Sequence, residues 1–406
     1  MTMKILEKSY YARRISPIDG HYTFGYYDLQ PFNKNLHLVH KFPFFDRLQQ
    51  PGDMAEIGLL DINNSVAKFE KLDETSAWNH QQGAMLQWNP ASPTDEIIYN
   101  AFIDGEFHGV VMNVNTGKKR YLDRPVANVS PKGDYAVSIN FPRLYDFRPG
   151  YGYADIKDPY FDVNHSDEDG VFLIDMKTGK SRLVLSMQQI WDFSGKFFDR
   201  DRKMNINHIT INTDGTRFLA LVRNFKEEGD VRHMTAIITA NLDGSDMFLL
   251  SDYGIQSHYH WKDAQNVIFY SDGKELDCRW KCDKEVLNLN TYVLKDKTWE
   301  GELVAGGAFW YDHHMSYSPD RKLILTDTYP TTTPFETVKI YNPETDVCVH
   351  LGHFYHVPVP TTDLRCDLHP RWNQDGSMIS FDSTCEGFRG VYLIDVDAIR
   401  EDLFRE

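Results

Sequence analysis

Short apolar runs, each closed by a polar turn, recur seven times along this chain. They are four to six residues long, rich in Val, Ile and Leu, and begin about 46 to 65 residues apart. Helical periodicity is almost absent. This spacing is typical of a four-stranded propeller blade with an occasional long loop, so the pattern predicts seven blades. The runs are 57–62, 109–114, 170–175, 235–240, 291–294, 337–341 and 390–395.

A second repeated signal precedes most of these runs. It is a tight turn rich in Asp, Gly and Pro followed by an apolar strand, as at 130–139, 213–222, 318–326 and 374–381. Turns of this kind join neighbouring antiparallel strands. We therefore predict an all-β fold, a seven-bladed β-propeller with four-stranded antiparallel blades. Because a propeller grows by repetition around an axis, residues 1–406 are expected to form a single domain.

Two segments, 143–169 and 186–203, depart from the repeat. Long loops on a repeat scaffold either cover a functional face or decorate it, and the sequence leaves both readings open.

Composition narrows the function classes. The formal net charge is −16, so no basic field would attract a nucleic acid. No window approaches a membrane span, and the amino terminus lacks a secretory signal, so we expect a cytoplasmic protein without membrane partners. Five cysteines, an odd number, suit a reducing compartment. Cys278 and Cys282 have a spacing found in zinc sites, but no second pair completes a four-ligand pattern.

Histidines fall at a common position in consecutive repeats. His208, His314 and His369 each precede the aspartate of the next turn by six residues, and His258 lies at a similar place. Equal positions in successive blades lie on one ring around the axis, so we expect these side chains to converge. Neutral imidazoles are common metal ligands and catalytic bases.

The second half of the chain resembles oligogalacturonate lyase, a seven-bladed propeller among the polysaccharide lyases. The matching stretches are 207–215, 232–245, 257–261, 314–316, 369–370, 379–384 and 391–396. The resemblance implies a lyase that cleaves uronate-containing glycans by β-elimination with a divalent metal, typically manganese. Its expected partner is an acidic oligosaccharide.

The resemblance also implies a set of metal ligands. The family's metal-binding histidines match His314 and His369, and a third histidine of the family falls on Asp367 here. The family's glutamine ligand falls on Leu364. A carboxylate can replace an imidazole for a hard divalent ion, so we expect a metal at His314, Asp367 and His369.

The family's base corresponds to His258 and its basic helper to Arg232, with His233 as an alternative helper. In the implied reaction, His258 removes the C5 proton of a uronate whose carboxylate is held by the metal and an arginine, and the C4 oxygen departs. We expect His208, His80 and Arg371 to bind substrate.

Other readings remain open. Propeller ulvan lyases are similar in outline and use histidine, tyrosine and arginine, which His80, Tyr145 and Arg143 would supply. A glycoside hydrolase on this scaffold would need two carboxylates, for which Asp312, Asp363 and Asp367 are candidates. A non-catalytic propeller that binds a glycan or a protein is the remaining alternative.

Overall fold

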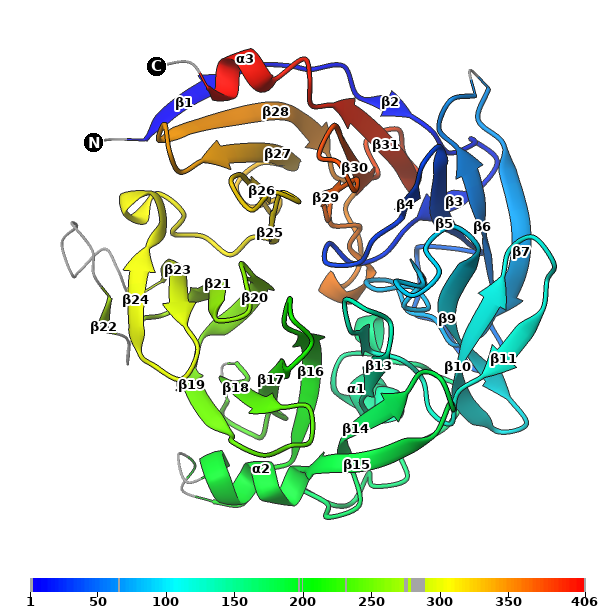
Figure 1. Cartoon of the computed structure of the whole chain (residues 1–406), viewed down its shortest axis with the longest axis vertical. Helices are drawn as coiled ribbons and strands as arrows, with labels where there is room; N and C mark the ends of the chain where they lie inside the picture. Colours follow the sequence, from blue (N-terminus) through cyan, green and yellow to red (C-terminus); the bar gives the residue numbers. More distant parts are fainter. Residues whose placement is uncertain are drawn as a thin grey trace.

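Seven β-sheets surround a common axis in the order of the chain (Figure 1). This computed structural model describes residues 3–64, 66–195, 198, 200–230, 232–273, 277–278 and 289–404. The predicted seven-bladed propeller with four-stranded antiparallel blades is confirmed, and three sheets carry an additional short strand. Each of the seven apolar runs lies in the third strand of its blade, counted outward from the axis.

Blades 1 to 4 follow one another from the first inner strand of the chain. Blade 1 contains β3 (His21–Thr23), β4 (Phe32–Asn33), β5 (Leu36–Phe42), β6 (Ala55–Asp61) and β7 (Phe69–Thr75). Blade 2 contains β8 (Gln87–Trp88), β9 (Glu96–Ile103), β10 (Glu106–Asn113) and β11 (Lys119–Tyr121). Blade 3 contains β12 (Asn128–Val129), β13 (Tyr135–Ser138), β14 (Gly170–Asp175) and β15 (Ser181–Ser186). Blade 4 contains β16 (Met204–Ile211), β17 (Arg217–Asn224), β18 (Thr235–Asn241) and β19 (Phe248–Gly254).

Blades 5 to 7 complete the ring, and two of them incorporate strands from the start of the chain. Blade 5 contains β20 (Gln256–Trp261), β21 (Asn266–Ser271), β22 (Asp277–Cys278), β23 (Asn290–Lys295) and β24 (Glu300–Leu303). Blade 6 contains β25 (Met315–Tyr317), β26 (Ile324–Thr326), β27 (Phe335–Asn342), β28 (Val347–Tyr355) and β1 (Lys4–Glu7). Blade 7 contains β29 (Arg371–Trp372), β30 (Met378–Ser383), β31 (Gly390–Asp395) and β2 (Arg13–Arg14).

The ring is closed by the first strands of the chain. Strand β2 pairs antiparallel with β31 and supplies the outer strand of blade 7, while β1 pairs parallel with β28 at the edge of blade 6. Both termini therefore lie at the outer rim (Figure 1). These pairings tie the two ends of the chain together, so the last blade is complete only when β2 is in place.

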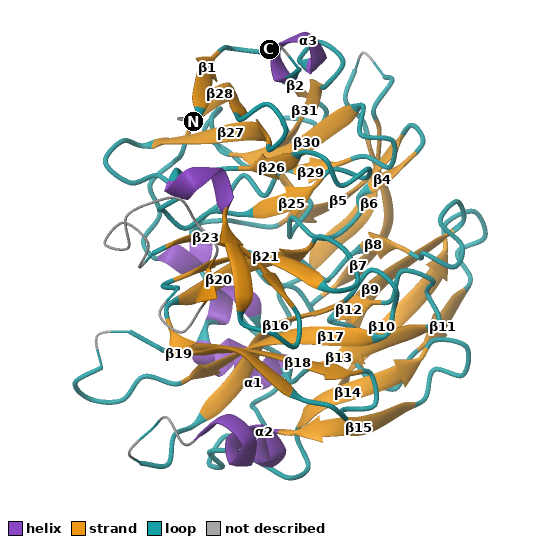
Figure 2. Cartoon of the chain, turned by 60° about the vertical axis from the view of Figure 1, so that its left-hand side comes forward, coloured by secondary structure: helices purple, strands orange, loops and turns teal. Residues whose placement is uncertain are grey.

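Helices are short and few beside the strands (Figure 2). The helices within the described residues are α1 (Phe141–Phe147), η1 (Pro149–Tyr151), α2 (Met187–Ser194), η4 (Val304–Gly307), η5 (Thr362–Leu364) and α3 (Arg400–Leu403). Among the described residues, no helix is long and apolar enough to cross a membrane.

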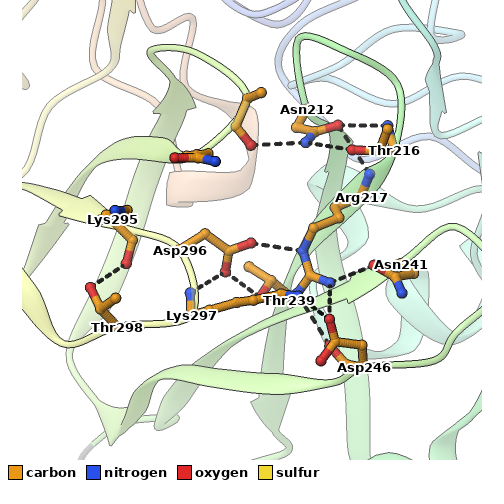
Figure 3. Close-up of polar contacts among 12 residues, drawn as sticks. Asn212, Thr216, Arg217, Thr239, Asn241, Asp246, Lys295, Asp296, Lys297 and Thr298 are labelled. Carbon is orange, nitrogen blue, oxygen red and sulfur yellow. Dashed lines mark hydrogen bonds and ion pairs between the residues drawn. The ribbon is translucent and has the colours of Figure 1, made fainter.

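Packing between blades combines apolar and ionic contacts. Leu219 and Ile237 of blade 4 belong to the same buried cluster as Phe269 of blade 5. Beside it, Arg217 of β17 donates from Nε to Oδ2 of Asp296 in blade 5 (2.7 Å), and its other nitrogens contact Thr239, Asn241 and Asp246 (Figure 3). The network joins two blades through one buried guanidinium.

The 143–169 segment is ordered around Arg143. Helix α1 is capped at its N-terminus by Asn140, whose side chain accepts the backbone N–H of Arg143, and it has a proline in its first turn. The guanidinium of Arg143 pairs with Asp158 at 2.9 Å and donates to the backbone carbonyls of Tyr160, Val163 and Asn164. One buried arginine thus organises the loop. Of 186–203, residues 196, 197 and 199 lie outside the described part. Cys282, whose spacing from Cys278 occurs in zinc sites, also lies outside it.

Candidate functional site

The four histidines at the common blade position converge around one tyrosine. The ring of Tyr26 stacks on His208, with centroids 4.7 Å apart, and meets His369 edge-on at 4.8 Å. His314 lies 4.2 Å from both His258 and His369, measured between ring centroids. The four side chains are buried. The predicted convergence is therefore present, and Tyr26 lies within it.

The local backbone structure sets the direction in which these side chains point. Strands β16 and β20 shift register beside these side chains, between Ile206 and His208 and between Gln256 and Tyr259. A bulge turns a side chain out of the regular alternation and is common beside functional sites. His369 has a φ of 41°, in the left-handed region that costs a non-glycine residue about 1–3 kcal/mol. Its position is held by hydrogen bonds from its backbone N–H to Asp327 and from its ring to the carbonyl of Gly25.

His314, Asp367 and His369 each offer a ligand atom, and these atoms lie within 4.8 Å of one another. Nδ1 of His314 lies 2.8 Å from Oδ2 of Asp327, and Nδ1 of His369 lies 2.9 Å from the carbonyl oxygen of Gly25. With each Nδ1–H donated to an oxygen, both Nε2 atoms carry lone pairs, yet they face each other at 3.1 Å. Two nitrogen lone pairs at that distance could both be satisfied by one cation bound between them.

The third member of this group is already paired with a cation. Arg365 donates to both oxygens of Asp367, at 2.6 and 2.9 Å. Burial alone would raise the pKa of Asp367, but Arg365 and the neighbouring His314 lower it well below the usual range. Burial lowers the pKa values of His314 and His369, which keeps both imidazoles neutral at pH 7. A carboxylate and two neutral imidazoles form a donor set that fits a divalent metal.

His258 is oriented by an adjacent carboxylate. Its Nδ1 lies 2.9 Å from Oδ1 of Asp312, while Ser257 donates its hydroxyl to Oδ2 of the same carboxylate at 2.8 Å. Burial opposes ionisation, but His258 and Ser257 lower the pKa of Asp312 to about 2. An ionised Asp312 holds the proton of His258 on Nδ1 and leaves Nε2 as the basic nitrogen. That nitrogen lies 3.3 Å from the hydroxyl of Tyr329, which also lies 3.1 Å from Nε2 of His314.

A pocket of about 660 Å³ opens beside His258 and contains a concentration of positive charge. The cationic side chains that line it are Arg148, Arg223, Lys226, Arg232 and Arg365. They occur in a chain with a formal net charge of −16. The pocket can therefore attract an anion locally, although the molecule as a whole repels one.

Arg223 is the most buried of the pocket arginines, with 4% of its surface exposed. Its terminal nitrogens donate to Asn207 and to the carbonyl of Gln256, but its Nε has no hydrogen-bond partner among the described residues. Burial and the nearby Arg148 lower its pKa to about 10, so it remains charged at pH 7. The charge of Arg223 therefore adds to the positive charge that lines the pocket.

The long segment 143–169 supplies part of this pocket. Asp146, Phe147, Arg148 and Tyr151, from α1 to η1, line its wall. Part of this segment therefore lies at the candidate site, and its role there remains a prediction.

Other residues predicted for the site lie in different places. Arg232 lines the pocket and is exposed, and His208 and His233 line it as well. His80 does not line the pocket; it packs against Trp78 and its Nε2 lies 2.9 Å from the carbonyl of Arg47. Arg371 also lies outside this pocket, in a buried pair with Asp382 at 2.9 Å. Substrate-binding roles for His80 and Arg371 remain predictions.

The side chains considered for an ulvan lyase are not brought together in the pocket. The guanidinium of Arg143 is paired with Asp158 within its own loop, and Tyr145 donates its hydroxyl to the carbonyl of Gln49. The hydrolase alternative needs a carboxyl group whose pKa is raised so that it can act as an acid. The pKa values of Asp312 and Asp367 are instead lowered. These two carboxylates therefore suit charge pairing better than proton donation.

Sequence reasoning missed several residues of the site. Arg148, Arg223 and Arg365 come from three different parts of the chain, and Tyr329 comes from a segment without a repeated motif. Asp312 was considered only as a hydrolase carboxylate. Its place in the sequence is informative, because Asp312 directly precedes the two histidines His313 and His314.

Comparison with known proteins adds a likeness in fold. No protein-family model matches the sequence, and no curated protein sequence matches it either. Among solved structures, an oligogalacturonate lyase in complex with manganese superposes with a TM-score of 0.64 at 14% identity, covering 97% of this chain and 96% of that one. The oligogalacturonate lyase of Vibrio parahaemolyticus gives a TM-score of 0.62 at 14% identity, covering 95% and 93%. The tricorn protease gives 0.53 at 12% identity and covers 97% of this chain but 35% of its own.

Proposed function

We propose that this protein is a lyase that cleaves short uronate-containing oligosaccharides by β-elimination, in the cytoplasm. The observation that carries the proposal is the position of His258. Its Nδ1 is held by Asp312, and its side chain lines a pocket that also contains Arg148, Arg223 and Arg365. A base with a fixed tautomer beside anion-binding groups is what proton abstraction next to a carboxylate requires.

The arginines would bind and orient the substrate. A uronate carboxylate can accept two parallel hydrogen bonds from a guanidinium, which fixes both position and rotation of the sugar. Arg148, Arg223 and Arg365 line the same pocket. An oligosaccharide carries one carboxylate per uronate unit, so several separated cations suit it better than a single one.

His314, Asp367 and His369 would hold a divalent metal, for which manganese is our first choice because a structural neighbour is described as a manganese complex. When bound, such an ion would help to neutralise the uronate carboxylate and so acidify the neighbouring C5 proton. Asp367 supplies a negative oxygen where the resemblance places a histidine. Leu364, at the glutamine position, supplies no ligand side chain, so the chain offers three.

The proton transfer is assigned to Nε2 of His258. The C5–H bond breaks and its proton passes to this nitrogen, while the electron pair forms the C4=C5 double bond and expels the C4 oxygen with the rest of the glycan. Asp312 stabilises the imidazolium that results, because its carboxylate lies 2.9 Å from Nδ1. The departing oxygen takes a proton from solvent or from a neighbouring hydroxyl.

Mass analysis of the products tests the proposal. Elimination yields a fragment that is unsaturated and one water lighter than the hydrolysis product. We expect such fragments from oligogalacturonates or related uronates, and none from His258→Gln. His260→Gln is the matched control, because His260 lies on the same strand β20 but lines a different pocket. Products that contain an added water would instead indicate a hydrolase, and glycan binding without any product would indicate a binding propeller.

A further inference from the structure

A second group of ligand side chains lies on the outer strands of blade 6. Glu7 of β1 and His350 and His353 of β28 each offer a ligand atom, all within 4.8 Å of one another. Nδ1 of His350 lies 2.7 Å from Oε1 of Glu7, and Nε2 of His353 lies 3.4 Å from Oε2. We propose that these three residues form a zinc site that fastens β1 to β28.

The backbone brings the two histidines to one face of the sheet. Residues three apart in a regular strand point to opposite faces. Here the pairing of β27 with β28 shifts register, since Lys339 pairs with His350 but Val338 pairs with Gly352. The additional residue, Leu351, forms a β-bulge that restores the two imidazoles to one side. Glu7 is the direct neighbour of His350 on β1.

A supporting contact orients one of the rings. Nδ1 of His353 lies 2.8 Å from the hydroxyl of Thr337, its cross-strand neighbour. A ring whose Nδ1–H is donated to an oxygen presents Nε2 as the ligand, and such contacts typically accompany metal-binding histidines. Lys339 is the lysine of β27. Its ammonium group donates a hydrogen bond of 2.6 Å to the hydroxyl of Tyr311.

Two imidazoles and one carboxylate are a common donor set for zinc. Bonds of about 2.0–2.1 Å in a tetrahedral arrangement place neighbouring ligand atoms about 3.3 Å apart. The 3.4 Å between His353 and Glu7 matches this spacing, whereas the 2.7 Å between His350 and Glu7 would lengthen when the ion binds. The fourth position would hold water. Because β1 makes only four residue pairs, at an exposed edge, an ion shared with β28 would hold the strand to the blade.

Zinc binding by equilibrium dialysis tests the site. The central group around His314 is a separate candidate for zinc, so the quantity of interest is the difference between variants. We expect His353→Asn to bind one equivalent less than the unmodified protein and Thr337→Val to bind that equivalent about 10- to 100-fold more weakly. His353 is half exposed, so its replacement should not unfold the chain. His108→Asn is the control, because His108 faces a single glutamate, Glu106, on β10.

Hydrogen exchange in β1 provides a second readout. Zinc should slow exchange of the Lys4–Glu7 amides in the unmodified protein and in His108→Asn, but not in His353→Asn. Equal zinc stoichiometry and affinity in the unmodified protein and His353→Asn would overturn the proposal and leave an ordinary surface ion pair. Zinc loss without any change in β1 exchange would overturn the fastening role.

Discussion

At the scale of single residues, the arrangement depends on what holds His258. Asp312→Asn keeps the shape of the side chain but removes the charge that fixes the Nδ1–H tautomer and stabilises the imidazolium. We expect kcat for unsaturated product to fall by about 100-fold or more, with little change in KM. Steady-state kinetics check this. Asp320→Asn, in the turn after β25, is the control, and an unchanged kcat in Asp312→Asn would remove His258 from the role of base.

Asp367 tests the metal group independently of the base. It supplies the negative oxygen beside His314 and His369, and Arg365 already orients it through two hydrogen bonds. We expect Asp367→Asn to weaken manganese binding by about 100-fold or more, measured by isothermal titration. Manganese affinity equal to that of the unmodified protein would exclude Asp367 as a ligand.

At the scale of elements, blades 4 and 5 are joined by the buried pair of Arg217 and Asp296. Arg217→Ala leaves a buried carboxylate without its partner, which typically costs about 3–5 kcal/mol. We expect a loss of that size in the free energy of unfolding, measured with urea. Lys180→Ala removes an exposed ion pair with Asp123 and should cost less than about 1 kcal/mol. Equal losses of unfolding free energy in the two variants would show that the buried ion pair stabilises the fold no more than the exposed one does.

The same scale shows what the sequence could predict. Each blade repeats a local pattern, so the seven third strands and the shared position of His208, His258, His314 and His369 were recognisable. The pocket arginines were not, because Arg148 depends on how the loop after α1 packs. Arg223 lies on β17 and Arg365 follows η5, and no repeat relates these positions. Closure through β2 is not predicted either, because two adjacent arginines give no strand signal.

At the scale of the whole molecule, buried histidines set the dependence of stability on pH. Burial lowers the pKa values of His37, His260 and His313 to about 3 and that of His40 to about 4, from about 6.5. The unfolded chain therefore binds more protons below pH 6.5, and stability is lost as the pH falls from 6.5 toward these values.

Two buried carboxyl groups act with the opposite sign. Burial raises the pKa of Asp28 to about 7 and that of Asp327 to about 8, so the folded state binds more protons than the unfolded state between pH 4 and those values. The buried histidines with lowered pKa values, which include His314 and His369, outnumber the buried carboxyl groups with raised pKa values, so we expect a net loss of stability as the pH falls below 6.5. Urea unfolding of the metal-free protein should show maximal stability near pH 6.5–7. A stability that rises steadily from pH 6.5 to 4.5 would contradict this balance.

The central claim is that the histidines at the axis and the arginines beside them perform β-elimination on uronates. The most direct measurement is the ultraviolet absorbance of the conjugated C4=C5 product while the protein, supplied with manganese, is incubated with oligogalacturonates and other uronate oligosaccharides. We expect an absorbance rise that is abolished by a chelator and by His258→Gln but persists in His260→Gln. No rise on any of these substrates, with manganese bound at His314 and His369, would contradict it.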